Sequence, residues 1–227
     1  MQLVAYGAQD IYLTGNPQIT FFKVVYRRHT NFSVESIEQT FNGTADFGKK
    51  VSCTISRNGD LVHKIYLQTT IPDQTWTGAN ATYNGTSVQN GMLRWVNYVG
   101  EKLINYVEVE IGGQRIDKHY GEWLHIWNQL TNPAGHEESY NRMVGNVQSL
   151  ITNRSTSAAG TMQGKRLYIP LQFWFCRNPG LALPLIALQY HEVKINIEFE
   201  ELKNLFIAHT SAGTSTPTEV STVGNLS

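Results

Sequence analysis

Apolar and polar residues alternate along several short stretches of the chain. Residues 51–55 read Val-Ser-Cys-Thr-Ile, and the alternation resumes over residues 61–67. A period of two is typical of a strand with one buried face. Asn58-Gly59 lies between the two stretches and favours a tight turn, because both residues adopt positive φ readily. The pattern therefore predicts a β-hairpin over residues 51–67.

Three further stretches show the same period. Residues 107–111 alternate, and Gly112-Gly113 offers a second tight turn into residues 114–119, which predicts a second hairpin. Every second residue is apolar over 167–175, where Pro170 favours an edge position or a bulge because proline has no N–H to donate. Residues 193–199 alternate without interruption and predict an amphipathic strand.

Two segments have helical spacing instead. Apolar residues recur at helical intervals over 121–130 until an Asn-Pro pair ends the segment, and a second short helix is predicted over 136–144. Residues 73–91 and 152–164 are rich in turn-forming residues and are interpreted as exposed loops. The apolar positions of the first helix are Trp123, Leu124, Ile126, Trp127 and Leu130.

The two ends of the chain differ from the middle. Apolar side chains crowd residues 19–26 without a regular period, and such a segment needs a surface to lie against. After residue 207 the sequence is mostly small and polar, and it buries too little apolar area to offset the entropy of ordering it alone. Together, six to eight predicted strands with short helical insertions indicate a β-sandwich or a barrel.

The charge balance limits the partners of the chain. Lys and Arg total 18, Asp and Glu total 18, and only 16% of the 227 residues are charged. Without a net positive field we expect no direct nucleic-acid ligand. We interpret the local cluster of Lys23, Arg27 and Arg28 as a solvated or ion-paired face rather than a genome contact, because nonspecific DNA binding needs many phosphate contacts.

Cysteine use and hydropathy point to a reduced protein outside the membrane. Cys53 and Cys176 fall in strand-like runs, where we expect buried free thiols. No basic and apolar leader opens the sequence. The longest apolar run, residues 181–188, contains Pro184 and falls far short of the roughly 18 residues of a spanning helix. We therefore expect neither a secretory signal nor a transmembrane segment.

No grouping of residues predicts catalysis. Glu122 and His125 have Glu-x-x-His spacing on one helix, but a second such helix, which a di-iron site needs, is missing. The sequence contains no Gly-x-Ser-x-Gly elbow and no phosphate-binding glycine loop. We expect no catalytic residues, no metal, no cofactor and no enzymatic activity.

Two surface hypotheses stay open. Asn80 and Asn84 each begin an Asn-x-Thr triplet, so a glycan is one hypothesis, and ordinary turn asparagines are the favoured alternative. Several aromatic side chains could form a platform for sugar, but such residues more often fill a sandwich core. These aromatic residues are Trp123, Trp127, Phe173, Trp174 and Phe175.

Four blocks of the sequence resemble one protein family, in the same order. Residues 7–33 read GAQDIYLTGNPQITFFKVVYRRHTNFS, and residues 169–196 read IPLQFWFCRNPGLALPLIALQYHEVKIN. The two short blocks between them are Asn58-Gly59-Asp60 and Ile111-Gly112-Gly113. Together they resemble the major capsid proteins of nucleocytoplasmic large DNA viruses, of the phycodnavirus, iridovirus, mimivirus and marseillevirus type. The resemblance spans roughly residues 5 to 205.

The resemblance implies a fold more specific than the pattern alone. It implies an all-β jelly-roll sandwich, the first half of a double jelly roll, with short helices inserted in its loops. We expect an amino-terminal arm over residues 1–30, the jelly roll over 31–207, and a linker or the truncated start of a second jelly roll over 208–227. A fragment of a longer chain is favoured, and a relative with a single jelly roll is the alternative.

The resemblance also implies a structural function. Three copies would close into a trimeric, pseudo-hexagonal capsomer of an icosahedral shell, made in the host cytoplasm and located in the virion. The implied partners are copies of the chain itself, neighbouring capsomers and minor capsid proteins, close to an internal viral membrane. The alternative is a carbohydrate-binding jelly-roll module, similar to a lectin, on a viral or cell surface.

Overall fold

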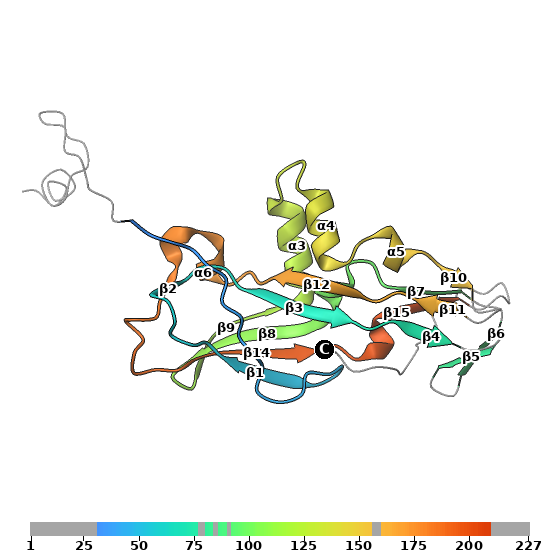
Figure 1. The fold of residues 1–227 in the computed structure, drawn as a ribbon, viewed down its shortest axis with the longest axis horizontal. Helices are drawn as coiled ribbons and strands as arrows, with labels where there is room; N and C mark the ends of the chain where they lie inside the picture. The colour runs from blue at the N-terminus through green and yellow to red at the C-terminus, as the bar shows by residue number, and fades with distance from the viewer. Residues whose placement is uncertain (1–30, 77–79, 84–85, 90–91, 156–159, 210–227) are drawn as a thin grey trace, which may run out of the picture. The chain divides into compact units, whose positions relative to one another are not determined.

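A computed structural model describes residues 31–76, 80–83, 86–89, 92–155 and 160–209, without the side chains of 76–91 and 208–209 (Figure 1). Contacts divide the chain after residue 37, and every element below belongs to the unit that starts at residue 38. The expected arm and most of the expected carboxy-terminal segment lie outside the described residues. Their boundaries therefore stay predictions.

A four-stranded antiparallel sheet forms one layer, with the strand order β1-β14-β8-β9. The β8–β9 hairpin turns at Gly112 and Gly113, whose φ angles of 61° and 84° are those that a tight two-residue turn requires. The predictions for residues 107–119 and 193–199 are confirmed. The strands are β1 (Lys50–Thr54), β14 (Val193–Phe199), β8 (Ile104–Ile111) and β9 (Gln114–Tyr120).

The other strands form smaller antiparallel groups. Figure 1 shows β3 and β12 running alongside the four-stranded sheet. The pairs are β3 (Tyr66–Ile71) with β12 (Lys165–Pro170), β2 (Leu61–Val62) with β13 (Leu183–Pro184), β4 (Gln74–Trp76) with β11 (Gly160–Met162), and β5 (Asn80–Tyr83) with β6 (Thr86–Gln89). The last group places β7 (Met92–Trp95) between β10 (Arg154–Ser155) and β15 (Phe206–His209).

One apolar core joins the two layers. Val107, Val109 and Ile195 from the four-stranded sheet belong to the same buried cluster as Leu167 and Ile169 from β12. Alternate residues of each strand point to this core, as the period of two predicts. Burial of apolar surface stabilises a fold by about 25 cal/mol per Å², so this cluster is the main source of stability.

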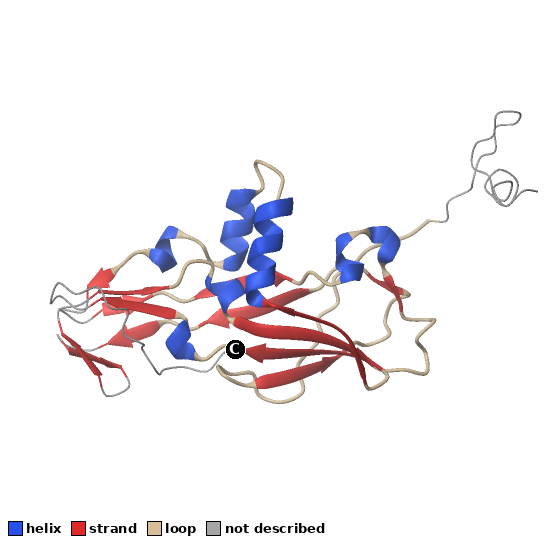
Figure 2. Ribbon diagram, turned by 180° about the vertical axis from the view of Figure 1, so that it is seen from behind, coloured by secondary structure: helices blue, strands red, loops and turns tan. Residues whose placement is uncertain are grey.

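Short helices occupy the connections between strands. The helix predicted over 121–130 is α3 (Gly121–Thr131), the one predicted over 136–144 is α4 (Glu137–Val144), and both are confirmed. In Figures 1 and 2 these two helices project beyond β12. The other helices are α2 (Val99–Lys102), α5 (Gln148–Ile151), α6 (Trp174–Arg177) and the 3₁₀ turns η1 (Pro179–Leu181) and η2 (Leu202–Asn204).

The predicted hairpin over residues 51–67 is wrong. β1 pairs with β14, placing Val51 opposite Ile197, while β3 pairs with β12. The chain thus leaves one sheet and enters another group of strands, so Asn58-Gly59 does not connect two paired strands. Alternation shows which face of a strand is buried, but it does not show which strand lies beside it.

Three other segments also differ from their predictions. Residues 73–91 and 152–164, interpreted as loops, contain strands β4, β5, β6, β10 and β11, which have only two to four residues each and are too short to show a period. The predicted strand 167–175 ends at Pro170, and residues 174–177 form α6 instead. Pro170 is the last residue of β12. Because β12 pairs with β3 on one side only, the edge position expected for Pro170 is confirmed.

Both cysteines are free and buried, as predicted. Burial raises the pKa of the Cys176 thiol to about 11, so this side chain stays protonated at neutral pH. The two residues therefore pack as small hydrophobic side chains.

Candidate assembly surfaces

The residues that the structure describes contain no group of three or more His, Cys, Asp or Glu side chains placed to hold a metal ion. Glu122 and His125, which share α3, contact different partners. A carboxylate oxygen of Glu122 lies 3.7 Å from Nζ of Lys102, and Nδ1 of His125 lies 2.8 Å from Oε2 of Glu101. Within the same described ranges, no helix has the length and apolar character needed to cross a membrane.

A buried carboxylate joins three helices. Glu101 of α2 is 2% exposed, and it contacts His125 of α3 and accepts a 2.6 Å hydrogen bond from the hydroxyl of Tyr140 in α4. Burial raises the pKa of Glu101, although both hydrogen bonds oppose the rise. Burial and the hydrogen bond to Glu101 raise the pKa of Tyr140 above its usual range. Because both carboxylate oxygens are engaged, we interpret Glu101 as a structural anchor.

The close approach of α3 to this carboxylate depends on a glycine. Gly121 begins α3, and a β-carbon there would collide with the carbonyl oxygens of Glu101 and Ile104. Its buried position and lack of a side chain let the start of α3 lie directly on the main chain of α2 and β8. The helix is therefore fixed at its first turn.

The outer face of the four-stranded sheet is polar, and its side chains pair with one another. Glu108 accepts hydrogen bonds from Nζ of Lys50 at 2.7 Å and from Nδ2 of Asn196 at 3.2 Å. Partial burial alone would raise the pKa of Glu108, but these hydrogen bonds outweigh it and the pKa lies below its ordinary value. Nζ of Lys118 lies 3.7 Å from the centre of the Tyr106 ring. Because these polar groups already have partners within the chain, this face gains little from association.

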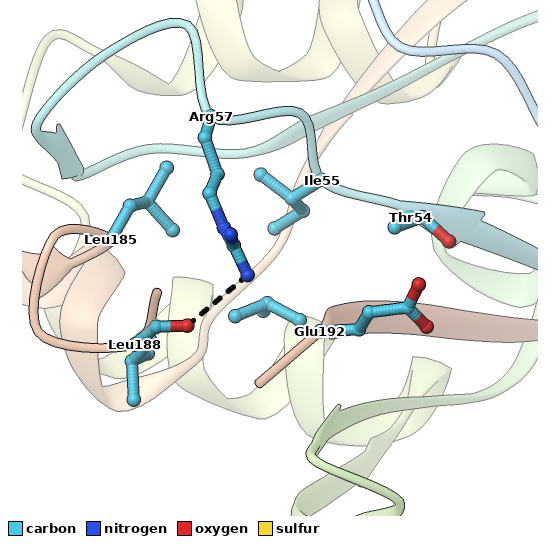
Figure 3. A pocket seen from close by; sticks show the side chains of 7 residues that line it. Thr54, Ile55, Arg57, Leu185, Leu188 and Glu192 are labelled. Carbon is cyan, nitrogen blue, oxygen red and sulfur yellow. Dashed lines mark hydrogen bonds between the residues drawn. The ribbon is translucent and has the colours of Figure 1, made fainter. Parts of the chain in front are cut away.

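Apolar side chains are exposed at the end of the sandwich formed by β2 and β13. Leu61, Leu181 and Ile186 are each more than half exposed. Arg57 crosses the neighbouring groove of about 390 Å³, and its guanidinium donates to the carbonyl oxygen of Leu188 at 3.3 Å (Figure 3). The groove is lined by Thr54, Ile55, Arg57, Leu185, Leu188, Glu192 and Val193.

A second exposed apolar area lies on α3. Ile126 is 50% exposed and Leu130 is 76% exposed, while the rings of Trp123 and Trp127 are partly exposed with their centres 5.8 Å apart. Leu124, on another face of the same helix, is buried in the core. The sequence pattern grouped all five residues together, and the structure separates one core-facing residue from four that lie at the surface.

The candidate glycosylation sites stay untested. Asn80 begins β5, where side chains are not described, and Asn84 lies outside the described residues. Among the aromatic candidates, Phe173 and Phe175 are fully buried, which agrees with their interpretation as core residues. Sequence reasoning did not identify Glu101, because in the segment Val-Gly-Glu-Lys-Leu-Ile over residues 99–104 it stands beside Lys102 and resembles an ordinary exposed charge.

These features define a class of protein: a β-sandwich whose described residues contain no cluster of metal ligands and whose surface carries exposed apolar areas. A family model described as "Major capsid protein N-terminus" matches residues 20–225. The chain belongs to this major capsid protein family.

Relatives of the chain are viral. It is 64% identical over 199 residues to the major capsid protein of Pyramimonas orientalis virus, covering 88% of this chain and 46% of that protein. It is 55% identical over 237 residues to the major capsid protein of Phaeocystis pouchetii virus, covering 95% of this chain and 44% of that protein. The chain thus spans about half the length of the curated relatives it matches.

Solved capsids share the fold. The quasi-atomic model of the PBCV-1 virus capsid matches with a TM-score of 0.62 and 37% identity, over 92% of this chain and 43% of that chain. The Faustovirus major capsid protein matches with a TM-score of 0.56 over 95% of this chain and 52% of that one, and at 15% identity it supports the fold alone. The expected all-β jelly roll with short inserted helices is confirmed.

Proposed function

We propose that this chain is the amino-terminal jelly roll of a viral major capsid protein and serves as a structural subunit of an icosahedral shell. The observation that carries the proposal is its match to the PBCV-1 capsid at 37% identity across 92% of the chain. The protein would be made in the host cytoplasm and incorporated into the virion. Its role would be to pack against neighbouring subunits of the shell, and we propose no enzymatic role.

The assembly that we propose is a homotrimer. A second jelly roll would follow this one, and the trimer, pseudo-hexagonal in outline, would contact neighbouring capsomers and minor capsid proteins above an internal membrane. Residues 1–30 would act as a connecting arm, and residues 208–227 would lead into the second half. The balanced charge of 18 basic and 18 acidic residues supports contacts with protein rather than with nucleic acid.

A chimera tests this proposal. The chain would replace the matching region of the Pyramimonas orientalis virus protein, and the mass of the purified product would be measured by light scattering during size exclusion. We expect trimers from the chimera, and the parent protein prepared in parallel serves as the reference. A persistent monomer that binds sugars on a glycan array would instead favour the carbohydrate-binding alternative and overturn the proposal.

A further inference from the structure

The loop between β1 and β2 contains an exposed asparagine followed by a glycine. Residues 55–60 belong to no helix or strand, and residues 56–60 are all exposed. Within the part of the chain that the structure describes, no hydrogen bond holds the backbone N–H of Gly59. A β-carbon added to Gly59 would meet no atom within 4 Å, so the space around this residue is open. The backbone nitrogen of Gly59 can therefore approach the side chain of Asn58.

This approach permits a reaction between the two residues. The nitrogen of Gly59 attacks Cγ of Asn58 and forms a C–N bond, and the side-chain nitrogen leaves as ammonia with the proton of the Gly59 N–H. Water then opens the resulting succinimide ring at either carbonyl carbon. Opening at the side-chain carbonyl gives aspartate, and opening at the main-chain carbonyl gives isoaspartate, whose peptide bond to Gly59 runs through Cγ. Either product carries a carboxylate that asparagine lacks.

A second asparagine–glycine pair, Asn42-Gly43, has a different environment. The backbone of Asn42 forms an isolated β-bridge with Ser52, and its N–H donates to the carbonyl oxygen of Ser52 at 2.7 Å. Closing the succinimide ring requires rotation of the backbone, which this bridge resists, whereas Asn58 lies in a loop. The remaining pairs, at 84–85 and 90–91, lie outside the described residues.

We propose that Asn58 is a site of spontaneous modification, where the folded chain converts asparagine to isoaspartate and aspartate through a succinimide. The bridge to Ser52 protects Asn42 from the same reaction. The conversion requires only water and the folded chain, so this inference does not depend on the proposed function.

The modification also alters how the loop is attached. Two contacts on either side of Asn58 hold the loop to the segment that follows β13. The guanidinium of Arg57 donates to the carbonyl oxygen of Leu188 at 3.3 Å (Figure 3), and the N–H of Leu185 donates to the carbonyl oxygen of Asp60 at 2.9 Å. Isoaspartate lengthens the main chain by one methylene group between these contacts. We therefore expect it to loosen the segment after β13.

Ageing of the purified 227-residue chain tests the choice of site. The chain is kept in mildly alkaline buffer, folded and, in parallel, unfolded in guanidinium chloride. Cleavage after lysine releases residues 51–64, whose only asparagine is Asn58, and residues 24–49, which contain Asn42. Mass spectrometry with fragmentation measures the gain of about 1 Da at each asparagine, and an isoaspartyl methyltransferase detects the isoaspartate.

The expected result differs between the two states. In the folded chain, conversion at Asn58 should be about ten-fold faster than at Asn42, because only the loop leaves the backbone free to rotate. In the unfolded chain the two rates should be similar, because a glycine follows both asparagines.

Gly59→Ala is the matched control variant. The φ of Gly59 lies outside the left-handed region and the surrounding space is open, so alanine fits there without strain. Its methyl group hinders attack by its own nitrogen, so conversion of Asn58 should fall about ten-fold while Asn42 keeps its rate. An unchanged melting temperature would show that the variant folds.

Hydrogen exchange tests the loosening. The amides of the segment after β13 should exchange faster in the aged chain than in the fresh chain, and an equally aged Gly59→Ala chain controls for changes elsewhere. Asn58→Asp adds the same charge without lengthening the main chain and should leave exchange unchanged. Equal acceleration in the aged chain and in the Asn58→Asp chain would show that the added methylene is not responsible.

Other outcomes would overturn the inference. Equal conversion of Asn42 and Asn58 in the folded chain would show that local structure does not select the site. An intact Asn58 in the folded chain, while the unfolded chain reacts, would show that the loop is closed to the reaction. Trimer formation by the chimera is measured on fresh protein, so the proposed function is tested separately.

Discussion

Between β8 and β14 the core-facing contacts are apolar, from Val107, Val109, Ile195 and Ile197, whereas α2, α3 and α4 meet around the buried carboxylate of Glu101. Apolar packing has little directional preference and does not depend on pH. Hydrogen bonds to a buried carboxylate fix the orientation of the helices that make them. Losing one partner is costly, because it leaves a buried polar group unpaired. The sandwich is therefore held by apolar packing throughout, while the three helices combine apolar contacts, such as that of Leu124, with a few directional polar atoms.

The largest expected effect lies in the sandwich. Phe173 is fully buried between His119, with ring centres 4.6 Å apart, and Phe175, at 5.6 Å. We expect Phe173→Ala to lower the free energy of unfolding by about 3–5 kcal/mol, because it leaves a cavity. Urea denaturation measures the change. Leu61→Ala, at a position 62% exposed, is the control, and similar losses in both variants would argue against a core role for Phe173.

A smaller and more local effect is expected at the helices. Glu101→Ala leaves the Tyr140 hydroxyl and His125 without their buried partner, at a cost of about 2–3 kcal/mol. Hydrogen exchange should speed up at the amides of α3 and α4 more than at those of β14. Glu122→Ala removes an exposed carboxylate of the same helix and should leave exchange unchanged. Uniform acceleration throughout the chain would contradict a local anchor.

The pH dependence should have opposite signs at the two carboxylates. The raised pKa of Glu101 means that its contribution to stability is fully present below the ordinary value near 4.5 and declines as pH rises through the raised pKa. The lowered pKa of Glu108 means that its contribution is present above the ordinary value and is lost as pH falls through the lowered pKa.

Two isosteric variants measure these slopes. The cost of Glu108→Gln should grow as pH rises from acid to neutral, whereas the cost of Glu101→Gln should shrink over the same range. Urea denaturation at a series of pH values gives both curves. Curves of equal slope would show that the two environments do not differ as described.

The smallest expected effect is at the surface of the helices. Arg142 donates a 2.6 Å hydrogen bond to Glu138 one turn earlier in α4, and both side chains are at least 70% exposed. We expect Arg142→Ala to change the free energy of unfolding by about 0.3–0.5 kcal/mol, and less at high salt. Thermal denaturation at two salt concentrations measures it. A loss as large as that of Glu101→Ala would mean that exposed ion pairs also anchor the helices.

Local signals in the sequence predicted local structure well. The Gly112-Gly113 turn was predicted correctly because the paired strands on either side are only two residues apart. The Asn58-Gly59 turn was misread, because the same turn-forming residues also suit a connection between different sheets. Glu101 was missed because its partners, His125 and Tyr140, are 24 and 39 residues away and no spacing rule links them.

The exposed apolar area on α3 illustrates the same limit. Its helical period was legible in the sequence, but the period is identical for a face buried within the chain and a face left exposed. Only the exposure of Ile126 and Leu130 distinguishes the two.

The sequence by itself determined the class of fold, the core-facing side of β8 and β14, and the resemblance to viral capsid proteins, because side-chain periods and motifs are properties of neighbouring residues. Only the tertiary structure decided that Thr54 pairs with Lys194, that Glu101 is buried among three helices, and that one row of α3 is left exposed. These outcomes depend on residues far apart in the chain meeting in space, and local pattern carries no information on such distances.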